Sequence, residues 1–348
     1  MNLSIYYSQR VTGGFMSIIL AVTLLLVCAS IFVNGWTDAP NAIATVVSTR
    51  VLHPRAAILL GAVMNFFGVF LMGTAVATTT ASIVSIGSGS DALVTLAAAQ
   101  LSIVLWAVGA WRFGIPTSES HALIAGLMGA GMSLSGFSAF NMDSVYKVLI
   151  GLFISSVIGF TLSLVFTKII KHSFRNMKRR SANRFFSIGQ IASASLMAFS
   201  HGAQDGQKFM GIMVLALVVG GILPNYQGVM VIPVWVMLIA SILMAIGTSI
   251  GGYRIIKTMG MDMVSLQKYQ GFAAELAASG SMLVATLFGI PLSTTNTKGT
   301  AMMGAGAAEG LHKVNWDIAK EMFTAWILTF PACMILAYIF AIVFRSLI

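Results

Sequence analysis

The chain has 348 residues, of which 57% are hydrophobic and only 9% are charged, and its formal net charge is +10. A soluble domain carries roughly 25% charged residues on its solvated surface, so this composition excludes a soluble protein and indicates one that lies in a membrane. The two cysteines, Cys28 and Cys333, lie in separate apolar runs, which excludes a disulfide framework and a metal site built on cysteine.

Apolar runs follow one another along the chain. They are Met16–Val33, Ala56–Val76, Val145–Ile170, Val229–Ile250 and Phe323–Phe344. A membrane-spanning helix needs ~20 apolar residues, and these runs are of that order. They lack the alternation of barrel strands, and a helix satisfies its own backbone hydrogen bonds within lipid. The sequence therefore predicts an all-α, multi-pass protein of the plasma (inner) membrane.

The first polar segment within this apolar sequence is Asn34–Ala42. Asn34, Asp38 and Asn41 are spaced i, i+4, i+7 and would share one face of a helix. Pro40 disturbs that helix, and a broken helix is tolerated in a membrane only where it lines protein or water. An ionised aspartate at this depth is costly and is functional by default, although a helix cap or a lysine partner would also explain Asp38.

The next polar motif is Ile115–His121. Four polar residues follow its Pro116: Thr117, Ser118, Glu119 and Ser120. Proline suits the first helical turn, and neighbouring Ser or Thr side chains cap free N–H groups, so the motif predicts a helix start. A helix N-terminus presents N–H donors and a positive dipole, which suits an anion. Ordinary capping of a short re-entrant helix is the alternative.

A cluster of basic residues lies near the middle of the chain. Seven lysines and arginines fall between Lys168 and Arg184, with no acidic residue among them. Positive charge in a short loop between spans marks the cytoplasmic side, so the loop 171–187 is expected in the cytoplasm, near anionic lipid rather than nucleic acid. The segment Met1–Phe15 carries a single basic residue, Arg10, which favours an external N-terminus.

The second half repeats these motifs in the same order. His201–Phe209 aligns with Asn34–Ala42, and Ile290–Asn296 aligns with Ile115–His121, at offsets of 167 and 175 residues. Because the basic loop precedes only the second repeat, the repeats are expected to enter the membrane from opposite sides, as in secondary transporters. The chain is thereby divided into a first transmembrane repeat (1–170), the basic loop (171–187) and a second, inverted repeat (188–348).

The repeat supplies a second set of polar side chains. These are His201, Asp205 and Lys208 at the same helical spacing, and Ser293, Thr294 and Thr295 after Pro291. Two helix starts that converge from opposite sides would form an anion site. Glu275 is a further acid in an apolar stretch, with Asn65 at the roughly corresponding place in the first half. Acids repel an anion unless cations or protons bind between them, which is a physical basis for symport.

At these residues the sequence resembles the PiT family of inorganic phosphate transporters. That family has a Gly-Ala-Asn-Asp-like and a Pro-Val-Ser-Thr-Thr-His-like motif in each half. The counterparts here are Asn34–Ala42, Ile115–Gly129, Phe199–Gly211 and Ile290–Gly304. The resemblance implies about twelve transmembrane helices, including broken helices and two re-entrant hairpins. It also implies import of phosphate by symport with Na+ or H+, without enzyme activity or any further cofactor.

The motifs and the resemblance together give the expected ligands. Phosphate ligands are expected among Thr117, Ser118, Ser120, Ser293, Thr294, Thr295, Asn41 and Gln204. Cation coupling is expected at Asn34, Asp38, Asp205, Glu275 and Glu119, with Na+ at Asp38 and Asp205 as one form of it. His121 and His201 are candidates for a proton relay, and a hydrogen-bonded structural role explains them equally well.

The sequence departs from the family pattern at several motif positions. The family's Asn before the motif Asp is Thr37 in the first half and Gln204 in the second, and Glu119 replaces a hydroxyl residue. Glu119 could carry a proton, or could pair with Lys208 or Lys298. These departures leave the coupling ion and the choice of oxyanion open.

Three alternatives to a phosphate symporter stay open from the sequence. Sulfate is also tetrahedral, so a sulfate carrier is the nearest alternative. An intramembrane phosphotransferase that uses His201 or His121 would have an unrepeated catalytic cluster, whereas these polar groups come in pairs. A passive anion channel would explain the donors but not the acids. A homodimer is compatible with such a fold, and nothing in the sequence supports it.

Overall fold

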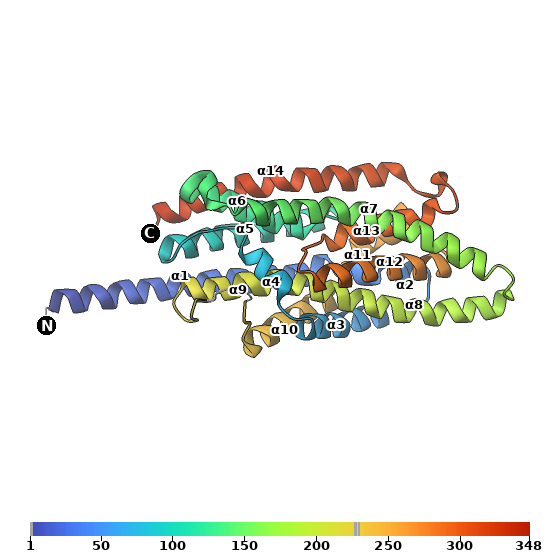
Figure 1. Ribbon diagram of the computed structural model, residues 1–348, viewed down its shortest axis with the longest axis horizontal. Coiled ribbons are helices and arrows are strands. Elements are labelled where there is room, and N and C mark those ends of the chain that lie inside the picture. Colours follow the sequence, from blue (N-terminus) through green and yellow to red (C-terminus); the bar gives the residue numbers. More distant parts are fainter. Residues whose placement is uncertain (1–2, 226–227, 229) are drawn as a thin grey trace.

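The computed structural model describes residues 3–225, 228 and 230–348, with side chains from Met16 onward. Met1 and Asn2, the terminus expected outside the cell, lie outside the described residues. The described chain is a bundle of helices without a β-strand, as Figure 1 shows, and its extended contacts are two isolated bridges, Val84–Phe140 and Val264–Val314. The α-helices are α1 (Leu3–Thr37), α2 (Ala39–Ser48), α3 (Pro54–Leu71), α4 (Ala75–Ala81), α5 (Ser90–Phe113), α6 (Glu119–Ser135), α7 (Met142–Ser173), α8 (Arg179–His201), α9 (Gln207–Val219), α10 (Val234–Ile250), α11 (Tyr253–Lys257), α12 (Lys268–Leu287), α13 (Thr294–Ala307) and α14 (Trp316–Ser346).

Six helical stretches of the described chain are long and apolar enough to cross a membrane. They are Met16–Ser48, Pro54–Leu71, Ser90–Phe113, Glu119–Ala139, Met142–Ser173 and Trp316–Ser346. A seventh span results if α10 and the following helical segment, which are bent by 63°, are taken as one. Length and apolarity thus select six or seven spans, fewer than the expected twelve. Helices α9 and α13 are too short to be selected, and α8 begins with basic residues.

The helices pack in reciprocal pairs. Helix α1 packs on α10 while α8 packs on α3, and α6 packs on α14 while α13 packs on α7. Likewise, α1 packs on α5 in the first half, and α8 packs on α12 in the second. In Figure 1, α1 and α8 begin at opposite ends of the long axis and run in opposite directions. In each of these cases, a helix of the first half and the helix seven positions later in the chain have packing partners that are also seven positions apart.

Glycines let these helix pairs approach closely. A Cβ on Gly129 of α6 would lie 2.0 Å from the carbonyl oxygen of Met334 in α14. A Cβ on Gly304 of α13 would lie 2.2 Å from the carbonyl oxygen of Phe160 in α7. Without a strong hydrophobic drive between helices in lipid, small residues of this kind permit the backbone contact that holds the bundle together.

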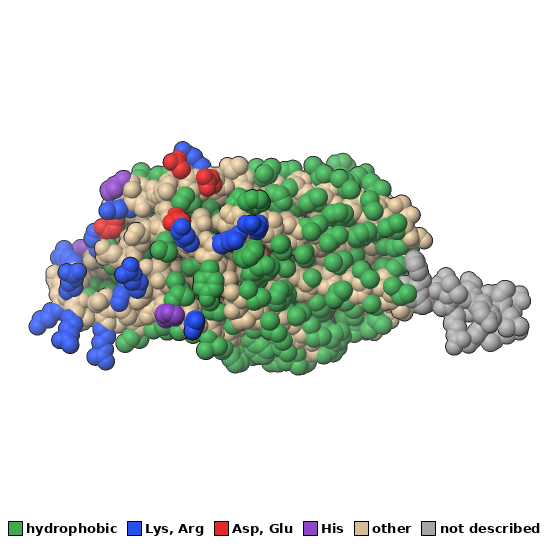
Figure 2. All heavy atoms as spheres, turned by 180° about the vertical axis from the view of Figure 1, so that it is seen from behind, with side chains coloured by type: hydrophobic (Ala, Val, Ile, Leu, Met, Phe, Trp, Pro, Cys, Tyr) green, Lys and Arg blue, Asp and Glu red, His purple; other side chains and the backbone are tan. Residues whose placement is uncertain are grey.

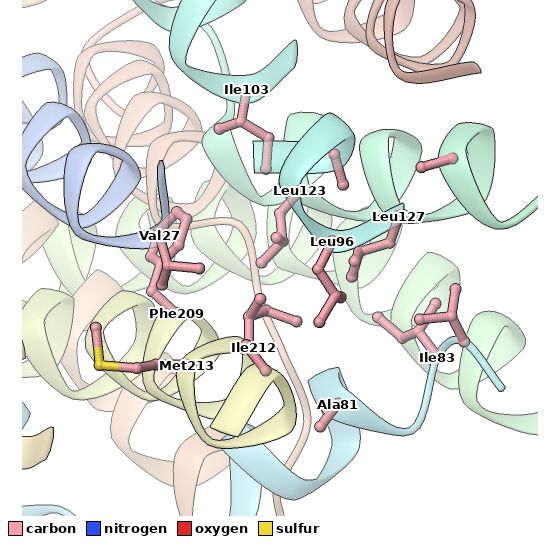
Figure 3. Close-up of a cluster of buried hydrophobic side chains, with 14 of the residues drawn as sticks. Val27, Ala81, Ile83, Leu96, Ile103, Leu123, Leu127, Phe209, Ile212 and Met213 are labelled. Carbon is pink, nitrogen blue, oxygen red and sulfur yellow. The ribbon is translucent and has the colours of Figure 1, made fainter. Parts of the chain in front are cut away.

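Apolar side chains fill the space between the first repeat and α9. In Figure 3, Ile212 of α9 points toward Leu96 of α5, and Phe209 and Ile212 belong to one buried cluster with Ile103 of α5 and with Leu123 and Leu127 of α6. The contact matters for the site because Phe209, which is 1% exposed, directly follows Lys208. The position of Lys208 is thereby fixed by packing on the first half.

The basic residues gather at one end of the molecule, as Figure 2 shows, beside a broad surface of apolar side chains. Helix α7 continues to Ser173 and α8 begins at Arg179, so only residues 174–178 connect them, and much of the expected loop 171–187 is helical. Lys171 forms an ion pair of 2.7 Å with Glu309, and this hydrogen bond is the main reason why the pKa of Glu309 is lowered.

We expect Gly129→Ala and Gly304→Ala to destabilise the protein by about 1–3 kcal/mol each, because the added methyl group meets a backbone carbonyl of the facing helix. Gly109→Ala in α5 is the control, since a Cβ there has no atom within 4 Å. The control should be neutral or stabilising by up to ~1 kcal/mol, the helix propensity difference. Denaturant unfolding in detergent micelles measures all three. If Gly129→Ala and Gly304→Ala unfold at the same denaturant concentration as the wild type, the helices do not depend on close contact at these glycines.

Candidate functional site

Two helix starts meet in the interior of the molecule. Ser118 caps α6, because its hydroxyl accepts a hydrogen bond from the His121 backbone N–H at 3.3 Å. Ser293 caps α13 in the same way, by accepting a hydrogen bond from the Asn296 backbone N–H at 3.1 Å. The two serine hydroxyls are hydrogen bonded to each other at 2.7 Å. The helix starts predicted from the two proline motifs are therefore confirmed, and the tips of the hairpins α5–α6 and α12–α13 touch.

The backbone around Asp38 in the first half differs from the backbone around Asp205 in the second half. In the first half the helix breaks, since α1 ends at Thr37 and α2 begins at Ala39, with Asp38 between them. Pro40 in the first turn of α2 lacks the N–H that a continuous helix would need. In the second half no proline is present, and the helix continues through a widened π-helical turn, Gly202–Gly206. The expected break is thus found only in the first half.

The two aspartates lie in one buried cluster. The Asn34 side-chain amide lies 3.3 Å from Asp205 Oδ2 and 3.5 Å from Asp38 Oδ2. His201 Nε2 lies 3.4 Å from Asp205 Oδ2 and 4.0 Å from Asp38 Oδ2. One ligand atom each from Asp38, His201 and Asp205 lies within 4.8 Å of the others, a spacing that could hold a metal ion. The structure therefore brings Asn34, Asp38, His201 and Asp205 together from both halves.

The hydroxyl residues expected as anion ligands currently donate to these aspartates. Thr294 Oγ1 donates to Asp205 Oδ2 at 2.9 Å, and Thr295 Oγ1 donates to Asp38 Oδ1 at 3.3 Å. Asn41 in turn donates to Thr295 Oγ1 at 3.0 Å. Each aspartate is therefore hydrogen bonded by a hydroxyl at the start of α13. The hydroxyl donors and the acids form one network rather than two separate sites.

Two buried lysines pair with acids. Lys208 Nζ lies 2.7 Å from Asp205 Oδ1 and also donates to Ser120 Oγ and to the Leu292 carbonyl, each at 2.6 Å. Lys298 Nζ lies 3.5 Å from Glu275 Oε1 and 3.2 Å from Thr45 Oγ1. Asp205 and Glu275 therefore each have an ammonium group beside them.

Glu119 differs from these two acids. Thr37 donates a hydrogen bond to its Oε1, while its Oε2 is buried without a hydrogen-bond partner in the described structure. Of the two alternatives for Glu119, a proton carrier or a partner of Lys208 or Lys298, the described structure does not form the pair, because both lysines are engaged by other acids. Thr37, which stands where the family has asparagine, thus supports a carboxylate that has no cation of its own.

Two expected phosphate ligands, Thr117 and Gln204, and the proton-relay candidate His121 have other surroundings. Thr117 lines an apolar groove that includes Ile115. The His121 ring packs against Phe330 with 5.1 Å between centroids, and its Nδ1 is buried without a partner. Gln204 holds the approach to α13, since its amide donates to Thr286 Oγ1 at 2.9 Å and to backbone carbonyls, and its Oε1 accepts from the Leu292 N–H at 3.2 Å.

The expected equivalence of Asn65 and Glu275 is wrong. Asn65 lies in α3, where it contacts His201 Nδ1 at 3.0 Å and donates to Thr248 at 2.8 Å. Glu275 lies in α12, the counterpart of α5, and the 175-residue offset of the Ser118 and Ser293 motifs places Gln100 at its position. Gln100 is fully buried, and neither atom of its side-chain amide has a hydrogen-bond partner in the described structure.

Sequence reasoning missed two residues that hold Glu275. Thr45 donates to Glu275 Oε1, and Ser193 donates to Glu275 Oε2 at 2.6 Å. Helical spacing could have found both, because Thr45 lies seven residues after Asp38 and Ser193 lies eight residues before His201. Each therefore continues the polar face of a helix already recognised.

Comparison with known proteins gives consistent results. The model of a family described as "Phosphate transporter family" matches residues 34–337. A "Probable low-affinity inorganic phosphate transporter" of Bacillus subtilis is 36% identical over 319 residues, which cover 91% of this chain and 95% of the relative. A protein of the same name from Rhizobium meliloti is 38% identical over 311 residues, which cover 88% of this chain and 90% of the relative.

A solved structure shares the fold. The structure titled "The sodium-dependent phosphate transporter" matches with a TM-score of 0.85 and 21% sequence identity. The match covers 95% of this chain and 100% of that chain. The arrangement of helices described above is therefore shared with that solved structure.

We expect Lys298→Met to destabilise the protein by about 3–5 kcal/mol, because it leaves the Glu275 carboxylate buried without a cation. The double variant Glu275→Gln/Lys298→Met should recover most of that loss, since it removes both charges together. Unfolding in detergent of the two single variants and the double variant gives the coupling energy. A double variant that loses the sum of the two single losses would show that the pair does not interact.

Proposed function

This chain belongs to the phosphate transporter family, and on that premise we propose that it imports inorganic phosphate by symport with a cation, Na+ or H+. The observation that carries the proposal is one buried cluster in which two helix starts and two aspartates from opposite halves converge. The helix starts supply donors for an anion, and the aspartates supply ligands for a cation.

The hydrogen bonds of the cluster suggest how the two substrates are coupled. Thr294 and Thr295 now donate to Asp205 and Asp38. If these hydroxyls turn to phosphate, each carboxylate loses a donor while a second anion arrives beside it. Burying uncompensated charge is costly, so phosphate binding is favourable only with a cation at the aspartates. By linkage, each substrate raises the affinity for the other.

Alternating access is the proposed mechanism. The reciprocal packing of the helices and the opposite directions of α1 and α8 support two inverted repeats, residues 1–170 and 188–348, around the site. The buried tips of the hairpins α5–α6 and α12–α13 support two re-entrant hairpins. The basic end of the molecule would face the cytoplasm, in contact with anionic lipid of the plasma membrane.

Phosphate uptake into proteoliposomes tests the proposal. Radiolabelled phosphate is supplied with an inward Na+ gradient in one arm and an inward proton gradient in another, and an ionophore that collapses each gradient is the control. Uptake should exceed the collapsed control in at least one arm, and excess unlabelled sulfate should leave it unchanged. Equal uptake with and without every gradient would refute symport, and strong inhibition by sulfate would point to a sulfate carrier.

We expect Asp38→Asn to abolish gradient-driven uptake while the protein still folds and inserts, because the amide keeps the shape but cannot balance a cation. Size-exclusion profiles of the purified variant check folding, and the uptake assay checks transport. Wild-type uptake by the Asn variant would remove Asp38 from the coupling site.

We expect Ser118→Ala to raise the phosphate KM by about 10–100-fold, the effect of losing a hydrogen bond to a charged group. Ser133→Ala is the matched control, since this serine lies on the same helix and its hydroxyl bonds only the local Ala130 carbonyl. Uptake kinetics at saturating cation measure both. A Ser118→Ala variant with an unchanged phosphate KM but an altered cation dependence would place Ser118 in the cation site instead.

A further inference from the structure

Lys208 sits in the kind of oxygen shell that usually surrounds a bound cation. Its Nζ has a carboxylate oxygen of Asp205 at 2.7 Å, the Ser120 hydroxyl at 2.6 Å and the Leu292 carbonyl at 2.6 Å. The lysine side chain is 3% exposed, and Asp205 is 1% exposed. Carboxylate, hydroxyl and carbonyl oxygens are the ligands of a hard cation in proteins.

The three contacts use every donor that the ammonium group has. A lysine ammonium carries three N–H donors and no acceptor. All three point to oxygen atoms of the protein, so none remains for phosphate. Lys208 is therefore placed as a counter-charge for Asp205 and not as a ligand of the anion.

The first half has a neutral residue at the same position. Asn41 follows Asp38 by three residues, as Lys208 follows Asp205. Asn41 contacts Thr295, two residues after the capping Ser293, and Lys208 contacts Ser120, two residues after the capping Ser118. The two side chains thus make reciprocal contacts with the opposite hairpin, and only Lys208 brings a charge.

The other buried acids divide in the same way. Glu275 of the second half has Lys298 beside it. Asp38 and Glu119 of the first half form no ion pair with a lysine or arginine anywhere in the described part of the chain. Close to these two acids, the described structure also leaves two buried oxygens of the first half without hydrogen-bond partners, Asn34 Oδ1 and Glu119 Oε2. A mobile cation would satisfy unpaired oxygens of this kind.

We infer that the ε-ammonium group of Lys208 is a built-in cation that fills the second-half cation position, so that the mobile coupling cation binds on the Asp38 and Glu119 side alone. The inference rests on the proposed symport and concerns its stoichiometry. Lys208→Asn should open a second position for a mobile cation. Asn41→Lys should place an ammonium group in the cation position of the first half, so that phosphate transport no longer depends on a mobile cation.

The experiment measures how steeply phosphate accumulation depends on the cation gradient. Proteoliposomes are loaded with a series of fixed gradients of the ion that drives the wild type, and the phosphate ratio at zero net flux is recorded. The slope of its logarithm against that of the gradient gives the number of cations carried per phosphate, when the membrane potential is clamped at zero. Gly109→Ala, which lies away from the site, is the control and should keep the wild-type slope.

Relative to the wild type, we expect the slope to rise by about one for Lys208→Asn and to fall by about one for Asn41→Lys, since each changes one cation position. A Lys208→Asn variant that transports with the wild-type slope would overturn the inference. If it folds but does not transport, its melting temperature must rise with cation concentration more steeply than that of the wild type; an equal dependence also overturns the inference. If it does not fold, Asn41→Lys decides, and retained cation dependence in that variant counts against the inference.

The outcomes separate this inference from the proposed function. A wild-type protein that shows no gradient-driven uptake rejects symport itself. A wild-type protein with coupled uptake, together with an unchanged slope in Lys208→Asn, rejects only the built-in cation.

Discussion

Asp38 and Asp205 share one asparagine, Asn34, in the interior of a protein whose outer surface is largely apolar. Carboxylate oxygens of the two residues lie within 4.8 Å of each other, and two negative charges this close repel strongly where water is excluded. Each needs hydrogen-bond donors, a counter-charge or a proton, and the polar residues nearby supply the donors from both halves of the chain. The hydroxyls at the start of α13 and the ammonium group of Lys208 meet part of this need.

Close helix packing keeps that cluster away from lipid. The backbone contacts at Gly129 and Gly304 hold α6 and α13 against the long helices α14 and α7. Because α6 and α13 begin at the site, these contacts also set where the capping serines lie. The apolar cluster around Phe209 does the same for Lys208. The polar centre is therefore positioned by backbone contacts that lie 11 residues beyond the capping serines and by the apolar packing of Phe209, the residue next to Lys208.

The sequence predicted the features that depend on local chemistry. Proline followed by serine specifies a helix start, so Ser118 and Ser293 were placed correctly, and the repeated motifs indicated that the two helix starts belong together. Features that depend on three-dimensional contacts were not predictable in the same way. The partner of Glu119 is Thr37, a residue 82 positions earlier, and Gln204 binds the chain before α13 instead of standing free for a ligand. Length and apolarity select fewer stretches than the expected twelve helices, because the polar helices of the site are sheltered by other helices and need not be apolar along their whole length.

The two halves are alike in shape but not in chemistry, and Gln100 shows the difference most clearly. The equivalent position of the second half carries Glu275, which is tied to α2 through Thr45, to α8 through Ser193 and to Lys298 of α13. Gln100 has no such ties. In a carrier with two interchangeable inverted halves, the inward-facing and outward-facing forms would be related by a two-fold rotation and would have equal energy. Here Glu275 has these bonds and the Gln100 side chain has none, so under the proposed alternating access the two forms would differ in energy, and one orientation would be preferred even when concentrations on the two sides are the same.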